Sequence, residues 1–251
     1  MTDTDYIYGL RAIIEAIDAG KEVDKIFIKK DLSGELASEL FDRVKQVRIP
    51  VQRVPVERLN RITRKNHQGA IAMLSAVTYH RLDHLVPQLY EEGMLPFIVV
   101  LDGITDVRNF GAIARTCECA GVDAIVIPEH GSVSVGGDAV KTSAGALHHL
   151  PVCRERSVRG AVKFLRENGY MVVAASEKAD INYTQADYTG PVAIVMGAED
   201  TGIDPEVIKQ CDTFVSIPMF GKIGSLNVSV AAGVMMYEVV RQRLQANMEV
   251  I

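Results

Sequence analysis

The stretch PVAIVMG, residues 191–197, is apolar almost without interruption and ends at a glycine. A strand with one face in water alternates apolar and polar residues, so an unbroken apolar run indicates a strand buried on both faces. Four similar runs lie in the same part of the chain, at 96–102, 123–128, 170–176 and 213–218. Together the five runs predict an α/β fold with a parallel sheet covered by helices on both sides.

Helices are expected between or after these strands, at about 107–120, 137–148, 157–168, 204–211 and 225–245. Parallel sheets of this type bind ligands beyond the carboxyl ends of their strands. Glycines and polar residues gather at those ends, in the segments 102–115, 197–202 and 217–227. Each segment alone could be a turn with a helix cap, but their shared position predicts that the three tips form one pocket.

The first third of the chain has a different organisation. Its helices are expected at 8–19, 33–48 and 56–64, and its strands at 25–29, 51–55 and 69–77. This pattern predicts a small α/β domain over 1–78 and a larger domain over 96–251. Residues 79–95 lack a strong core pattern and are expected to be a linker.

The composition is that of a globular protein, since 48% of the 251 residues are apolar and the net charge is −5. No apolar run is long enough to span a bilayer, and the polar start MTDTDYIYG does not resemble a secretory signal. We therefore expect a cytoplasmic protein with no membrane partner. Four cysteines, two of them on different faces of one expected helix, predict core residues rather than disulfides or a metal site.

Positive charge is concentrated near the N-terminus. Residues 1–80 contain 13 Lys+Arg and 11 Asp+Glu, a net of +2, whereas the rest of the chain carries −7. Within residues 43–65 eight basic side chains accompany a single acid, Glu57. A solvated surface is the simpler interpretation, but such a cluster in an acidic protein also suits a polyanion such as a nucleic acid.

Several familiar sites are excluded by the motifs. The sequence has no GxGxxG turn after a strand, no GxxxxGK[ST] loop and no HExxH pair. A nucleotide-dependent oxidoreductase on a doubly wound sheet would need the first of these motifs, so this class of enzyme loses its main support.

The start of the last helix is harder to interpret. Ser225 has the position of a helix N-cap, and Asn227 falls one or two residues inside the helix, where asparagine is a mediocre helix former. The free N–H groups of a helix N-terminus, together with these two polar side chains, would equally suit a ligand.

Three segments, in this order and spacing, resemble a known family. NFGAIAR (109–115), VMGAEDTGI (195–203) and SIPMFGKIGSLNVSVAAG (216–233) look like the three motifs of SpoU/TrmH-type RNA ribose 2′-O-methyltransferases. YGLRAIIEAI (8–17), NHQGAIA (66–72) and KTSAGAL (141–147) are similar to the two-domain bacterial members that methylate a guanosine of 23S rRNA. The resemblance covers nearly the whole chain.

The resemblance implies the fold and the cofactor. The family belongs to the SPOUT superfamily, whose catalytic domain contains a trefoil knot and uses S-adenosylmethionine, here over 96–251. Residues 1–78 would be a ribosomal-protein-like domain that binds the RNA substrate. The cofactor is expected at the knot, held largely by backbone groups around Gly197, Ile217 and Leu226, with Met196, Pro218 and Met219 as further binding positions.

The same resemblance implies the catalytic positions, Asn109, Arg115, Glu199, Ser225 and Asn227. Asn227 would then be a functional exception to helix propensity. We expect Arg115 to stabilise developing alkoxide charge or to anchor a phosphate, because arginine stays protonated unless a site strongly lowers its pKa. Two roles are open for Glu199, which would either orient Arg115 or shape the turn.

The RNA contacts are expected on the basic residues of the first domain and beside the pocket. They are Arg53, Arg58, Arg61, Arg64, Lys65, His67, Gln68, Arg108 and Lys141. Aromatic residues are sparse in the first domain, which argues against extensive base stacking. The expected partners are 23S rRNA or a ribosomal assembly intermediate. A second copy of the chain is implied for the apolar last helix, which would otherwise be buried within the monomer.

Two alternatives stay open. The same enzyme class could act on tRNA, although the ribosomal type of first domain argues against it. A protein that binds RNA without methylating it is the second alternative, and the intact polar positions speak against it. Lys222 and Ile223 in the loop, and Val107 in the first motif, depart from the family pattern without removing an expected catalytic group.

Overall fold

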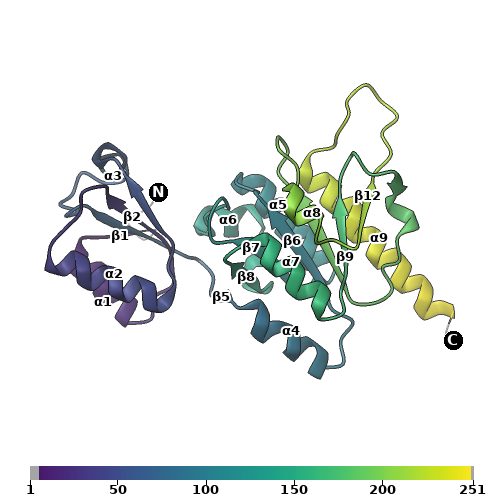
Figure 1. Ribbon diagram of the computed structural model, residues 1–251, viewed down its shortest axis with the longest axis horizontal. Helices are drawn as coiled ribbons and strands as arrows, with labels where there is room; N and C mark the ends of the chain where they lie inside the picture. The colour runs from purple at the N-terminus through teal and green to yellow at the C-terminus, as the bar shows by residue number, and fades with distance from the viewer. Residues whose placement is uncertain (1–5, 250–251) are drawn as a thin grey trace. The chain divides into compact units, whose positions relative to one another are not determined.

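The computed structural model describes residues 6–249, with side chains as far as Ala246. The first five residues, part of the start that does not resemble a secretory signal, and residues 250–251 lie outside this range. The chain divides into two compact units, the first Met1–Thr78 with Ser134–Asp138 and the second Tyr79–Val133 with Ala139–Ile251. Figure 1 labels most of the helices and strands of both units.

The first unit is a four-stranded sheet of order β1-β4-β2-β3 with three helices. Its elements are β1 (Tyr6–Tyr8), α1 (Leu10–Asp18), β2 (Val23–Lys29), α2 (Glu35–Val47), β3 (Val51–Val54), α3 (Val56–Ile62) and β4 (Ala70–Leu74). Strand β1 replaces the start of the expected helix 8–19, because Gly9 has a φ of 90° and forces the helix to begin at Leu10. Helices α1 and α2 cover one face of the sheet, where Ile13, Ile26 and Leu40 are buried together.

The second unit contains an eight-stranded sheet of order β10-β12-β9-β11-β6-β7-β8-β5, in which every pairing is parallel. The strands are β5 (Tyr79–His80), β6 (Phe97–Asp102), β7 (Ala124–Pro128), β8 (Val152–Glu155), β9 (Met171–Ala175), β10 (Ile181–Asn182), β11 (Val192–Gly197) and β12 (Thr213–Ser216). The predicted parallel sheet is therefore confirmed, with three short strands, β5, β8 and β10, added to the five expected ones.

Helices cover this sheet on both faces, as predicted. They are α4 (Leu82–Glu91), α5 (Val107–Cys119), α6 (Gly137–Thr142), α7 (Val158–Glu167), α8 (Pro205–Ile208) and α9 (Val228–Glu249), with short 3-10 turns at Ala146–His148 and Tyr183–Gln185. Side chains of α4, α7 and α8 share one buried cluster with β6, β9 and β11. Helices α5 and α9 pack against each other, and α9 also packs on β11.

Two predictions about the chain between these elements were wrong. The expected linker 79–95 contains β5 and α4, and Leu82 and Val86 of α4 are buried in the core of the second unit. Its helical pattern was obscured by Pro87, which lies within the helix. The expected helix 137–148 ends early at Thr142, since Ala144 and Gly145 take left-handed conformations.

The cysteine prediction holds for Cys117 and Cys153, which are buried, but not for Cys119, which is exposed. Burial raises the pKa of the Cys153 thiol to about 12, so it is inert at neutral pH. No helix in the described part of the chain is long and apolar enough to cross a membrane. Among residues 6–249 no group of histidine, cysteine or acidic side chains could hold a metal ion. The trefoil knot stays a prediction.

Candidate functional site

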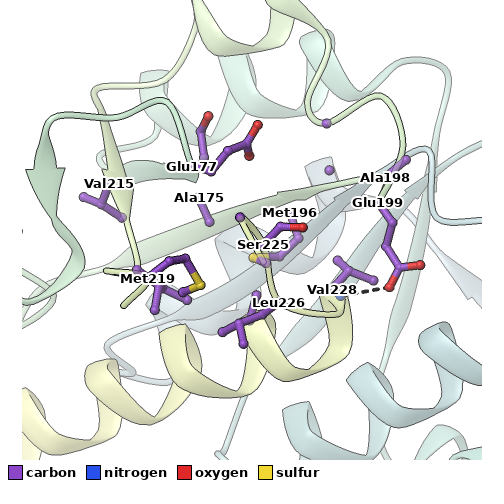
Figure 2. A pocket seen from close by; sticks show the side chains of 16 residues that line it. Ala175, Glu177, Met196, Ala198, Glu199, Val215, Met219, Ser225, Leu226 and Val228 are labelled. Carbon is purple, nitrogen blue, oxygen red and sulfur yellow. Dashed lines mark hydrogen bonds between the residues drawn. The ribbon is translucent and has the colours of Figure 1, made fainter. Parts of the chain in front are cut away.

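A pocket opens at the carboxyl ends of three neighbouring strands, β9, β11 and β12, and at the N-terminus of α9. Its empty volume is about 660 Å³, including space open to solvent. Figure 2 shows Met196, Met219 and Leu226 around this cleft, with Glu199 at its edge. The walls are thus mainly apolar, with carboxylates at the margin.

Gly197, the last residue of β11, allows an unusually close approach of two backbone segments. A Cβ at this position would lie 2.3 Å from both the carbonyl carbon of Gly202 and the nitrogen of Ile203. The intervening loop is closed by a hydrogen bond of 2.8 Å from Gly202 N to Ala198 O. Only glycine fits at position 197, and the tight loop forms one wall of the pocket.

Asn227, not Ser225, caps α9. The helix begins at Val228, Asn227 O accepts hydrogen bonds from Val230 N and Ala231 N at 3.0 Å, and its side-chain oxygen accepts one from Ser229 N at 3.0 Å. The sequence prediction placed the cap two residues too early. Asparagine is favoured at an N-cap, so Asn227 does not conflict with helix propensity.

The side-chain amide of Asn227 joins three segments that are far apart in the sequence. Its nitrogen donates to Asn109 Oδ1 at 3.0 Å and to Glu199 Oε1. The same carboxylate oxygen accepts a hydrogen bond of 3.1 Å from Val228 N. We call Asn109, Glu199 and Asn227 the polar bridge. It brings together the three polar segments that the sequence predicted to meet, but no residue of the first segment, 102–115, lines the pocket.

The first turn of α5 is fixed by its own cap. The carboxylate of Asp106 accepts hydrogen bonds from Arg108 N at 2.7 Å and from Asn109 N at 3.1 Å. Asp102, at the end of β6, accepts a bond of 2.8 Å from Asp204 N. Burial raises the pKa of the Asp102 carboxyl, while this hydrogen bond acts in the opposite direction. Both carboxylates therefore hold the loops around the pocket.

Arg115 lies apart from the polar bridge. It is exposed on α5, and its side chain makes no hydrogen bond or ion pair among the residues that the structure describes. The contacts of Glu199 go to the start of α9, which favours the structural role of the two considered for it. Gly111, on the same helix, serves packing, because a Cβ there would lie 2.1 Å from Thr142 Oγ1.

Most of the expected cofactor residues line the pocket. Met196, Gly197, Ile217, Met219 and Leu226 do so, as does Ser225, but Pro218 does not. Sequence reasoning missed residues 175–177, which line the pocket after β9. The end of the predicted strand 170–176 could have indicated them.

The basic residues of the first unit differ in their surroundings. The guanidinium of Arg53 lies over Phe41 and that of Arg58 over Phe27, and Lys65 Nζ lies 5.7 Å from the ring centre of Tyr8. Arg61 and Arg64 are exposed. In the second unit, Arg108 is exposed and paired with Asp106, and Lys141 is exposed on α6.

His67 and Gln68 have structural contacts that the sequence did not predict. His67 is buried, and its Nδ1 accepts from Gly69 N at 3.0 Å, so the proton lies on Nε2, which donates to Asn60 Oδ1 at 3.0 Å. Gln68 Oε1 accepts a bond of 3.0 Å from Leu10 N at the start of α1. Both side chains therefore have contacts within the unit, they also line a hollow together with Lys65, and their role in RNA binding stays a prediction.

Comparison with known proteins gives matches to both units. Residues 96–237 match the SpoU rRNA Methylase family, and residues 6–80 match the family described as RNA 2′-O ribose methyltransferase substrate binding. A putative TrmH family tRNA/rRNA methyltransferase of Staphylococcus saprophyticus is 35% identical over 94% of this chain and 95% of its own length.

Two solved structures with bound cofactor are also similar. The SpoU methyltransferase AviRb from Streptomyces viridochromogenes, in complex with AdoMet, is 27% identical, with a TM-score of 0.60 over 96% of this chain and 90% of that one. An AdoMet-bound rRNA methyltransferase from Sinorhizobium meliloti is 25% identical, with a TM-score of 0.60 over 94% and 87% of the two chains.

Proposed function

Since the chain belongs to the SpoU rRNA methylase family and is an S-adenosylmethionine-dependent RNA 2′-O-methyltransferase, we propose that it methylates a guanosine ribose in 23S rRNA. The main support is the combination of a substrate-binding unit in which basic residues outnumber acidic ones with a mainly apolar pocket at the carboxyl edge of the sheet. The similarity of the chain to an rRNA methyltransferase adds to this.

The pocket suits S-adenosylmethionine. Its apolar side, formed by Ile217, Met219 and Leu226, suits the planar base of the cofactor. Leu226 is 37% exposed, so it offers apolar surface for a ligand to cover. The carboxylates of Glu177 and Glu199 at the margin suit a ligand that carries positive charge. When bound, the cofactor supplies a methyl group that its sulfonium has already activated for displacement.

The protein must then orient the ribose and stabilise charge on its 2′-oxygen. We assign the second task to Arg115, whose exposed guanidinium is available to an incoming alkoxide or phosphate. The polar bridge keeps Asn109 and Asn227 in place beside the pocket, and Ser225 supplies a hydroxyl within it.

We also propose that the enzyme is a homodimer. Val230, Tyr237 and Leu244 of α9 are each more than half exposed, at 52%, 52% and 57%. They are spaced seven residues apart and therefore form one stripe along the helix. A second copy of α9 would cover this stripe.

The test is transfer of labelled methyl from S-adenosylmethionine to unmodified 23S rRNA and, in parallel, to unmodified tRNA, with identification of the product nucleoside. We expect 2′-O-methylguanosine in the rRNA alone. Label in tRNA would keep the reaction and overturn the substrate. If neither naked 23S rRNA nor a ribosomal assembly particle is labelled, the proposed rRNA substrate is wrong.

A further inference from the structure

The two faces of the sheet in the first unit are covered unequally. Helices α1 and α2 lie against one face, and only the short helix α3 lies against the other (Figure 1). On that second face Leu59 of α3 buries Phe27 and Ile71, which occupy neighbouring positions on β2 and β4. The part of the face farther from α3 is only partly buried.

This part of the face carries two tyrosines. Tyr6 and Tyr8 of β1 alternate with Ile7, so their rings lie on the same side of the sheet, with centres 6.3 Å apart and planes inclined by 45°. Tyr6 is opposite Met73 of β4, and Met73 is opposite Lys25 of β2. All four side chains are half-buried, so each packs against the unit and also exposes part of its surface to solvent.

One cation lies over a ring of this pair, and a second lies over the buried Phe27 on the same face. Lys65 Nζ lies over the ring of Tyr8, and Arg58 lies 4.9 Å from the ring centre of Phe27. Arg61 and Arg64 are exposed on and just beyond α3. Lys25 is balanced by Asp24 at 3.6 Å, and Glu57 is the one acid in the stretch from 43 to 65. We call Tyr6, Tyr8, Met73 and Lys25, with Lys65 at their edge, the tyrosine face.

We propose that the tyrosine face binds unstacked bases of a single-stranded segment of the RNA substrate. The inference rests on the proposed function, because it names the part of the substrate-binding unit that holds the RNA. Aromatic rings at a sheet surface stack on bases of any sequence, and neighbouring cations contact the phosphates between them. Aromatic residues are sparse in this part of the sequence, but the fold places three of them, Tyr6, Tyr8 and Phe27, on one face of the sheet.

The charge distribution favours RNA over a protein partner. An apolar strip alone would suit an amphipathic helix, but here Lys65 lies over the ring of Tyr8, and Arg58 lies over Phe27 on the same side of the sheet. Binding a polyanion releases counterions from its phosphates, which a neutral partner cannot offer. A double helix keeps its bases stacked, so the face should prefer a single strand.

The experiment measures the affinity of the full chain for a fluorescein-labelled single-stranded RNA of about twelve nucleotides, and for its duplex, by anisotropy over a range of salt. We expect Tyr6→Leu/Tyr8→Leu to bind the single strand at least about tenfold more weakly at every salt concentration, with an unchanged salt slope. Tyr6→Phe/Tyr8→Phe keeps both rings and should bind within about twofold of the wild type. Lys65→Ala should instead reduce the slope of the logarithm of the binding constant against the logarithm of the salt concentration by about 1.

Phe41→Leu is the matched control. It removes an aromatic ring of the same unit that also lies under an arginine, but on α2 and away from the tyrosine face. This variant should bind RNA normally. A folded Tyr6→Leu/Tyr8→Leu protein with wild-type affinity, or a wild type that binds the duplex as tightly as the single strand, would overturn the proposal.

A second measurement avoids the risk that the double variant does not fold. Nitration of the tyrosines in the wild type, mapped by mass spectrometry, should be slowed by the single-stranded RNA at Tyr6 and Tyr8 but not at Tyr90 of the second unit. Equal nitration with and without RNA would refute the tyrosine face.

Methyl transfer is assayed on the same preparations, so that failure of the proposed reaction can be distinguished from failure of the proposed RNA contact at the tyrosine face. Protection and weakened binding without any transfer to rRNA would support the tyrosine face and refute the proposed reaction. Transfer to rRNA with unaltered binding by Tyr6→Leu/Tyr8→Leu would refute the tyrosine face alone.

Discussion

The polar bridge of the second unit and the tyrosine face of the first are built from different interactions. In the polar bridge one amide, that of Asn227, satisfies two partners on other segments through directed hydrogen bonds. At the tyrosine face a cation lies 5.7 Å from the ring centre of Tyr8, without a fixed donor and acceptor. Hydrogen bonds weaken steeply when their geometry changes, whereas charge and ring contacts tolerate displacement.

This difference matches the two tasks of a methyltransferase. Displacement of a methyl group requires reacting atoms that are held within a fraction of an ångström, which directed bonds can achieve. Recognition of a long polyanion requires many weak contacts that tolerate variation along the strand. Substitutions near the pocket should therefore act strongly on cofactor binding or turnover, and those in the first unit gradually and in a salt-dependent manner.

The largest effect is expected for Gly197→Val. The new side chain would meet the backbone of Gly202 and Ile203, so the pocket wall must move, at a cost of about 1–3 kcal/mol in the free energy of unfolding. Calorimetry should detect no cofactor binding. Gly221→Ala is the control, because no atom lies within 4 Å of its new Cβ. Normal cofactor affinity in Gly197→Val would show that this wall does not shape the site.

Arg115→Ala should lower turnover by about 10²–10³-fold, the usual result of removing a group that stabilises charge in the transition state. Cofactor affinity should stay close to that of the wild type, because Arg115 does not line the pocket. Arg159→Ala, on α7 across the sheet, serves as the control for the loss of an exposed arginine. Unchanged turnover would remove Arg115 from the reaction.

Asn227 has two roles, which two substitutions can separate. Asn227→Ser keeps an N-cap but cannot donate to both Asn109 and Glu199, so turnover should fall about tenfold while stability is preserved. Asn227→Ala should in addition lose about 1 kcal/mol in the free energy of unfolding, as measured with urea. If the serine variant turns over normally, the polar bridge serves the fold only.

The smallest effect is expected for Arg61→Glu/Arg64→Glu. RNA binding should weaken several-fold at low salt and approach that of the wild type at high salt, because the slope falls by about 0.7–0.9 for each phosphate that is no longer neutralised. Turnover at saturating RNA should not change. Lys45→Glu on α2 is the control for reversal of a basic charge elsewhere in the unit. An unaltered salt slope would clear Arg61 and Arg64 of a role in RNA binding.

Much of the second unit could be predicted from its sequence, because strands buried on both faces leave short apolar runs bounded by glycine and polar residues. The meeting of three polar segments followed from the rule for parallel strands. The N-cap of α9 could not be predicted in this way, because the choice between Ser225 and Asn227 depends on the backbone of the loop before the helix. Hydrogen bonds between residues distant in the sequence could not be predicted either. One example is the bond from Leu10 N, at the start of α1, to the side chain of Gln68.

The order of the strands also has a consequence for synthesis of the chain. Strand β6 ends at Asp102, but β11, its partner on one side, begins only at Val192. As translation proceeds, β6 can pair with β7 long before its other edge has a neighbour. An apolar strand with an open edge invites pairing with other chains. A nascent or truncated chain that stops before Val192 is therefore expected to aggregate, and a chaperone that shields this edge would act during that interval.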